Sequence, residues 1–172
     1  TFNPIKTDGT LVHLGTSVRY RDQRGDSDLR FRQRAYAHIP SRIISTGRIA
    51  ESDVFYGVEA AAIFQNFWVS GEYGATDANS SDSTVNDASL NGLYGEVGVF
   101  FGGKKTYKGG KFNRPKVDNP VTDGGYGALS LVARYDTIDL SDDSVNGGDL
   151  DTFVIGADWF VSHQRYCARR YE

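Results

Sequence analysis

The chain has 172 residues and a formal net charge of −3, and it contains 20 Gly, 10 Tyr, 10 Phe and no Met. Its mean hydropathy is −0.44, and no apolar run approaches the ~20 residues of a membrane-spanning helix, which excludes a helical membrane protein. Abundant glycine and aromatic residues favour all-β structure instead. No charged and then apolar leader follows Thr1, so we expect that any signal peptide has already been removed.

Alternating apolar and polar residues predict strands along most of the chain. They lie at 10–21, 28–39, 54–64, 67–75, 90–101, 127–140 and 151–161. A tail at 164–172 breaks the alternation, because Arg165, Arg169 and Arg170 fall on both faces. With this tail the count reaches about eight strands.

The strand predicted at 127–140 shows the pattern most clearly. Leu129, Leu131 and Tyr135 lie on one face, and Arg134 and Asp136 lie on the other, because successive side chains of a strand point to opposite sides. The strand is longer than the ~5–6 residues usual in soluble proteins. It suits a tilted strand across a bilayer, which needs roughly 9–11 residues, so the sequence predicts an antiparallel transmembrane β-barrel.

The same alternation sorts the side chains of the other strands into two faces. We expect apolar side chains to face lipid, among them Val97, Val99, Leu129, Leu131, Phe153 and Ile155. Polar side chains would then line the lumen, namely Glu59, Glu72, Glu96, Arg134 and Asp158. Aromatic residues near the strand ends fit the girdles that such barrels carry at both membrane interfaces.

The connections between the predicted strands alternate in length. Short ones lie at 22–27, 65–66 and 162–163, and long ones at 40–53, 77–89 and 139–150. Outer-membrane barrels place short turns at the periplasmic end and longer loops outside, so the strand at 10–21 should run toward the periplasm. The connection at 102–125 is long but falls at the periplasmic end, and it is strongly basic, with no acid between Lys104 and Lys116.

Three arginines, Arg30, Arg32 and Arg34, share one face of a predicted strand at intervals of about 7 Å. Guanidinium groups remain charged and offer forked donors that match phosphate oxygens, so this ladder could pass an anion from one site to the next. Arg19 and Arg21 could extend it, although nearby aspartates could pair with them. From the residues alone, a merely polar lumen wall explains the arginines equally well.

The glutamates of the predicted lumen wall, Glu59, Glu72 and Glu96, could suggest acid–base chemistry. Salt bridges to arginines such as Arg134 are the better explanation. His13 and Ser17 share a face without a third group that would make a nucleophile–base pair, and the glycines and lysines at 102–105 lack the spacing of a phosphate-binding loop. We therefore expect no catalytic site, no metal and no cofactor.

Several short motifs in order resemble the phosphate-selective porin O/P family of outer membranes. They are HLG at 13–15, RYR at 19–21, RFR at 30–32, GVEAA at 57–61, SGEY at 70–73, KF at 111–112, RPK at 114–116, GGYGAL at 124–129, ARY at 133–135, IDL at 138–140 and GADWF at 156–160. The resemblance implies a barrel of about sixteen strands, usually trimeric, that passes anions through an arginine-lined lumen. By that template, 1–172 is one partial barrel domain without the amino-terminal half and the last strand.

The residues and the resemblance together predict an outer-membrane porin for passive diffusion of anions, with a preference for phosphate-like solutes. Its partners would be phosphate or other small anions, outer-membrane lipid and lipopolysaccharide, and two further copies in a homotrimer; no nucleic acid is expected. The alternative is a small eight-stranded outer-membrane barrel with a structural or adhesive role, a size at which side chains fill the interior. A membrane enzyme and a ligand-binding β-sandwich rank below both.

Overall fold

The computed structural model describes residues 1–23, 29–34, 41–80, 87–143 and 145–162. These residues form antiparallel β-structure with one short 3-10 helix, at Val121–Asp123. The strands are β1 (Phe2–Thr7), β2 (Thr10–Asp22), β3 (Leu29–Gln33), β4 (Ile44–Ala50), β5 (Ser52–Phe64), β6 (Phe67–Asn79), β7 (Ala88–Phe101), β8 (Gly103–Lys108), β9 (Lys111–Val117), β10 (Ala128–Asp142) and β11 (Val145–Phe160). No helix in these ranges is long and apolar enough to span a membrane.

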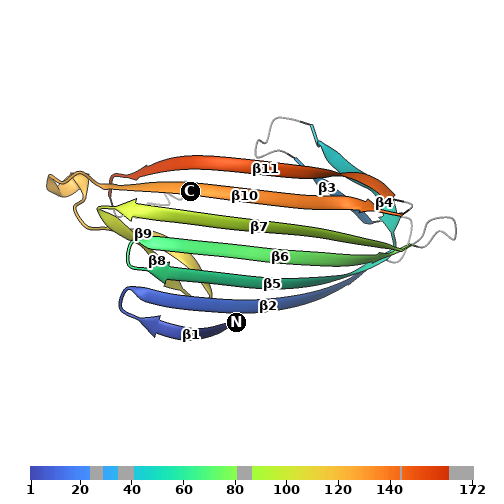
Figure 1. Cartoon of the computed structure of the whole chain (residues 1–172), viewed down its shortest axis with the longest axis horizontal. Helices are drawn as coiled ribbons and strands as arrows, with labels where there is room; N and C mark the ends of the chain where they lie inside the picture. The colour runs from blue at the N-terminus through green and yellow to red at the C-terminus, as the bar shows by residue number, and fades with distance from the viewer. Residues whose placement is uncertain (24–28, 35–40, 81–86, 144, 163–172) are drawn as a thin grey trace, which may run out of the picture.

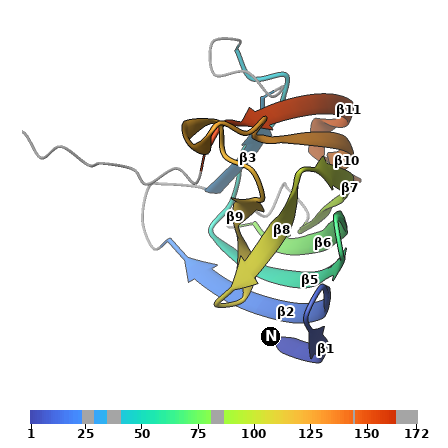
Figure 2. The same ribbon diagram turned by 90° about the vertical axis from the view of Figure 1, so that its left-hand side faces the viewer.

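Seven strands form one large sheet in the order β1-β2-β5-β6-β7-β10-β11 (Figure 1). Every neighbouring pair is antiparallel, and the sheet curves into a trough (Figure 2). Within the described residues, β1 and β11 each pair on one side only, so this part of the sheet is open. The prediction of an all-β antiparallel fold is confirmed, and closure into a barrel of about sixteen strands stays a prediction.

The prediction that residues 28–39 form a strand of the wall was wrong. Residues 28–39 were expected to lie in the sheet beside 10–21, but β3 pairs only with β4 in a separate two-stranded sheet. The wall strand β2 pairs directly with β5, from Thr10 opposite Phe64 to Asp22 opposite Ser52. Alternation identifies a strand but says nothing about its partner: β5 pairs with one edge of β2 along its whole length, and β1 pairs with the first part of the other edge. Residues 28 and 35–39 of the predicted strand lie outside the described ranges.

This pairing reverses the predicted direction of β2. Because β2 and β6 both run antiparallel to β5, β2 runs in the same direction as β6. The ends of β2, β6 and β10 therefore gather at one end of the sheet, which we call the loop end (right in Figure 1). The opposite end, where β5, β7 and β11 finish, is the turn end. The predicted turns at 22–27 and 65–66 thus lie at opposite ends, although 24–27 are not described.

Two connections contain more structure than the sequence indicated. The basic connection at 102–125 forms the β8–β9 hairpin, which lies on the concave side of the sheet (Figure 2). The acidic segment at 139–151 mostly continues β10 and β11, with Asp142 opposite Val145. Strand β1 was not predicted. The predicted turn at 162–163 and tail at 164–172 lie, apart from Ser162, beyond the described residues.

The convex face of the sheet is apolar and exposed, as predicted. Its side chains include Val18, Val58, Val69, Val97, Leu131, Phe153 and Ile155, which range from 42% to 77% exposed. Val99, predicted on this face, is half-buried. Cross-strand pairs such as Val69 with Val97 and Ala133 with Ile155 place these residues on one side of neighbouring strands.

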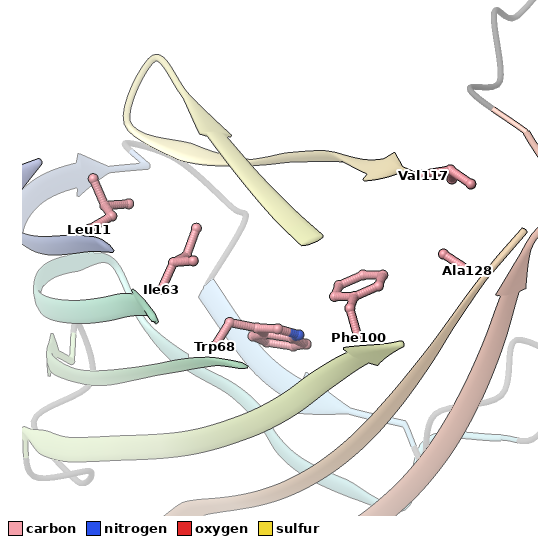
Figure 3. Packing of buried hydrophobic residues seen from close by; sticks show 6 residues of the cluster. All are labelled: Leu11, Ile63, Trp68, Phe100, Val117 and Ala128. Carbon is pink, nitrogen blue, oxygen red and sulfur yellow. The ribbon is translucent and has the colours of Figure 1, made fainter. Parts of the chain in front are cut away.

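The buried residues lie between the concave face and the two hairpins. At the turn end, the β8–β9 hairpin covers a cluster formed by Leu11, Ile63, Trp68, Phe100, Val117 and Ala128 (Figure 3). The indole of Trp68 lies over Gly98, where a Cβ would come within 2.5 Å of the ring, so a side chain at position 98 would displace it. At the loop end, β4 packs on the sheet through a cluster of Ile44, Ala88, Leu90, Leu140 and Val145.

Candidate functional site

A hollow of about 700 Å³ lies at the loop end, between the β3–β4 hairpin and the concave face of the sheet. Six arginines line it: Arg19, Arg21, Arg30, Arg32, Arg34 and Arg42. All five arginines predicted for the anion ladder therefore meet in one place. They meet because the β3–β4 hairpin folds back over the sheet, and not because they continue one wall strand. Arg42, just before β4, was not predicted.

Backbone hydrogen bonds attach the β3–β4 segment to the rim of the sheet. The amide of Gln23, just after β2, donates to the carbonyl of Glu51 at 2.9 Å, and the amide of Glu51 donates to the carbonyl of Asn79 in β6 at 2.9 Å. Within the segment itself, at the end of β3, the amide of Ile43 donates to the carbonyl of Gln33 at 3.1 Å. The arginines of this segment are thus held over the sheet by backbone contacts.

Arg19 and Arg21 are held by one buried carboxylate, Asp53, whose side chain is 0% exposed. Arg19 Nη2 donates to Asp53 Oδ2 at 3.0 Å, and Arg21 donates through Nε to Oδ1 and through Nη2 to Oδ2, each at 2.9 Å. The guanidinium of Arg19 also lies 5.3 Å from the ring centre of Phe55, and that of Arg21 lies 5.8 Å from Phe31. Two positive charges thus share one negative charge, and aromatic rings fix their position.

The remaining arginines crowd against one another. Burial, together with the positive charges of Arg30 and Arg34, lowers the pKa of Arg32. Burial is also the main cause that lowers the pKa of Arg42, and the positive charges of Arg32, Arg34 and Arg30 add to it. Guanidinium groups stay protonated despite such shifts. Within the described residues, no carboxylate lies at ion-pair distance from Arg30, Arg32 or Arg42. The hollow therefore concentrates positive charge that an anion would offset.

A polar belt crosses the concave face beside the hollow. Arg134 lies 3.6 Å from Glu96 and 2.5 Å from Asp136, and its guanidinium stacks 3.7 Å from the ring centre of Tyr94. The hydroxyl of Tyr94 donates to Glu72 Oε1 at 2.6 Å. The predicted ion pair of the wall glutamates with Arg134 is thus found for Glu96, whereas Glu72 takes a tyrosine hydroxyl.

Glu59, the third predicted wall carboxylate, has a different partner. Its Oε1 lies 2.9 Å from Nε2 of His13, a residue that is 4% exposed. The other ring nitrogen of His13 lies 2.7 Å from the hydroxyl of Tyr107 in β8, which also donates to Asn3 at 3.0 Å. This chain of contacts joins the wall to the β8–β9 hairpin. Its polar groups are used for mutual hydrogen bonds, which gives it a structural role.

The β8–β9 hairpin also brings a lysine onto the concave face. Nζ of Lys105 lies 3.9 Å from the ring centre of Trp68 and 5.0 Å from that of Phe112. Burial lowers the pKa of Lys105, and the charges of Glu96 and Asp158 act in the opposite direction. A second, smaller hollow of about 150 Å³ lies between this hairpin and the wall, and it shares Glu72 and Tyr94 with the arginine hollow. The two hollows therefore adjoin at the polar belt.

Asp53 and Phe55 were not predicted as site residues, although their inward orientation could be deduced from the alternation of β5. Both are in phase with Glu59 on β5, so alternation would have turned them inward, but only the pairing of β2 with β5 places Asp53 beside Arg21. Arg42 carried no such signal, because it lies outside any alternating segment. Within the part of the chain that the structure describes, no group of His, Cys, Asp or Glu could hold a metal ion.

Comparison with known proteins identifies the family. The family model for "Phosphate-selective porin O and P" matches residues 1–166. A curated protein of Caulobacter vibrioides (strain ATCC 19089 / CIP 103742 / CB 15), named "Uncharacterized protein", is 37% identical over 170 residues, which cover 91% of this chain and 33% of that protein. The chain thus spans about a third of the length of this relative, and no solved structure matches it. With a trough-shaped antiparallel sheet, an apolar convex face and a family match along nearly its whole length, the chain belongs to the phosphate-selective porin O and P family of outer-membrane porins.

Proposed function

We propose that this chain forms part of the wall of an outer-membrane channel through which small anions diffuse passively, and that phosphate-like solutes are favoured. The observation that carries the proposal is the convergence of six arginines from the wall and the β3–β4 segment on one hollow of about 700 Å³. The hollow lies on the polar concave side of a sheet whose other face is apolar and exposed. That arrangement suits a water-filled passage surrounded by lipid.

The arginine hollow would attract anions through its local field. Arg19 and Arg21 share the charge of Asp53, whereas Arg30, Arg32 and Arg42 add positive charge without a described counter-ion. Forked guanidinium donors can replace part of the water shell of a phosphate oxygen. Glu72, which lies where the two hollows adjoin, repels an anion and keeps binding weak enough for release, as conduction requires.

The same proposal assigns the remaining surfaces and partners. The convex face, with Ile155 and Phe153 at 77% and 67% exposure, would contact the acyl chains of outer-membrane lipid, and the loop end would lie near lipopolysaccharide. The intact porin would assemble as a homotrimer, as members of the family commonly do. A small structural or adhesive barrel is less favoured, because its interior would be filled by side chains, whereas a wide hollow lies open on this concave face.

The test is made on the intact porin in planar lipid bilayers. Replacing Arg30, Arg32 and Arg34 together with Ala should lower the anion-to-cation permeability ratio in KCl gradients and weaken the block of chloride current by phosphate, because three positive charges leave the hollow. Replacing the same residues with Lys should keep the permeability ratio and weaken the preference for phosphate over chloride, because the forked geometry is lost.

A matched control comes from the opposite strand of the same hairpin. Arg48 pairs with Arg30 across β3 and β4 but does not line the hollow. Arg30→Ala should therefore reduce phosphate block more than Arg48→Ala does. Equal effects of the two single variants, or unchanged selectivity in the triple Ala variant, would show that the arginine hollow does not select anions.

A further inference from the structure

Part of the lining of the arginine hollow is apolar. It includes Leu90 and Leu140, each 3% exposed, and the partly buried Phe31, Ile138 and Leu150 that pack against them. These side chains belong to the cluster that fixes β4 on the sheet, so they form a built floor. Inorganic phosphate, which is small and fully hydrated, would use the arginines and leave this floor in contact with water.

The size of the hollow points to the same class of ligand. A volume of about 700 Å³ lies within the range of roughly 300–1,000 Å³ that is typical of sites for drug-sized organic molecules. Such sites combine mostly apolar walls with a few convergent polar groups. Here the convergent groups are guanidinium ions, and the apolar lining includes Ile138 and Leu150.

Aromatic rings already associate with the guanidinium groups of this hollow. The ring of Phe55 lies 5.3 Å from the guanidinium carbon of Arg19, and it packs along the wall over Gly57 and Gly74, where a Cβ would come within 3.0 Å and 2.8 Å of ring atoms. Tyr94, which also lines the hollow, stacks at 3.7 Å with Arg134 of the neighbouring polar belt. Guanidinium planes stack on aromatic faces, so the hollow has the chemistry to hold an aromatic ring beside an acidic group.

We infer that the arginine hollow prefers organic anions in which an acidic group is joined to an aromatic body, such as aryl phosphates, over inorganic phosphate. This inference rests on the proposed function, because it requires that the arginines attract anions. The acidic group binds at Arg30 and Arg32, and the aromatic body lies on the floor at Ile138 and Leu150. The ester oxygen of an aryl phosphate joins the two parts without disturbing either contact.

The test compares anions that share one acidic group. In planar bilayers with the intact porin, phenyl phosphate, methyl phosphate and inorganic phosphate are added separately at one pH, and the concentration that halves the chloride current is measured. Burial of the larger apolar body predicts that phenyl phosphate blocks at an about tenfold lower concentration than methyl phosphate. Equal or weaker block by phenyl phosphate would overturn the inference.

A variant with a matched control locates the effect. Ile138→Thr keeps a β-branched residue on the floor but adds a hydroxyl, and it should reduce the advantage of phenyl over methyl phosphate to about threefold or less. Val132→Thr makes the same type of change on the same face of β10, against the turn-end cluster, and should leave the advantage at its wild-type value. An undiminished advantage in Ile138→Thr would contradict the assignment of the floor.

The outcomes also separate this inference from the proposed function. If none of the anions blocks the current and Arg30→Ala has no effect on selectivity, the proposed function fails and the inference fails with it. If inorganic phosphate and methyl phosphate both block, but phenyl phosphate gains nothing, the anion channel stands and only the preference for an aromatic body is refuted.

Discussion

Asp53→Asn should lower stability and strengthen anion binding at the same time. Asp53 is 0% exposed and accepts three hydrogen bonds from Arg19 and Arg21. Asparagine has the same size but carries no charge, and its amide NH₂ would replace an acceptor and face a guanidinium donor. Both arginines would then lose their counter-ion, and the hollow would gain one unit of positive charge.

The structure bounds both effects. Breaking a buried ion pair by removing one partner costs about 3–5 kcal/mol when both groups are desolvated. Arg19 and Arg21 are 54% and 39% exposed, so water can solvate the guanidinium groups again, and we expect a loss of about 2–3 kcal/mol. Two unit charges roughly 8 Å apart interact by about 0.5 kcal/mol in a water-like dielectric, so one added positive charge at the hollow should raise anion affinity roughly twofold.

Two measurements on the intact porin test this prediction. Urea titration of the folded porin in lipid vesicles gives the change in unfolding free energy, and phosphate block of the chloride current gives the change in affinity. Asp77→Asn is the control, because Asp77 is an exposed carboxylate at the same end of the sheet whose described partner is the hydroxyl of Ser89, at 2.9 Å; it should change both quantities little. Unchanged stability together with unchanged or weaker phosphate block in Asp53→Asn would refute the assigned role of Asp53.

The remaining predictions concern the hairpin and the convex face. Tyr107→Phe removes the hydroxyl that contacts His13 and Asn3, so it should destabilise the packing of the β8–β9 hairpin on the wall by about 1 kcal/mol. Hydrogen exchange should become faster in the hairpin and not in the large sheet, and an equal increase in both would contradict the structural role of this hydroxyl. Ile155→Lys places a charge on the convex face, where Ile155 is 77% exposed, and should destabilise the porin in vesicles by about 2–4 kcal/mol. Val154→Lys, on the concave face of the same strand, should cost much less, and equal losses would reverse the assignment of faces.

Local alternation was enough to predict most of the wall and its two faces. Segments such as 54–64 and 90–101 lie within β5 and β7, and the inward position of Arg134 and the outward position of Leu131 followed from their places in the strand. The reason is geometric: a strand turns successive side chains to opposite sides whatever its neighbours are. The face on which a strand residue lies can therefore be predicted from a few residues of sequence.

The pairing partner of each strand could not be predicted in the same way. Residues 29–33 alternate as regularly as any wall strand, yet they pair with β4 and lie over the sheet. Strand pairing depends on contacts between residues far apart in the chain, and here β5, not β3, pairs with β2 from Thr10 to Asp22. The predicted direction of β2 failed for the same reason. A local sequence pattern carries no information about which strands pair.

The candidate site shows both sources of information. The sequence by itself determined that the chain carries inward-facing arginines on β2 and a cluster of arginines at 30–34, since residue type and alternation are local properties. Only the tertiary structure decided that these arginines meet with Arg42 in one hollow, that Asp53 holds two of them, and that an apolar floor faces them. These contacts join residues far apart in the chain, and they arise because burial of the loop-end cluster draws the β3–β4 hairpin onto the sheet.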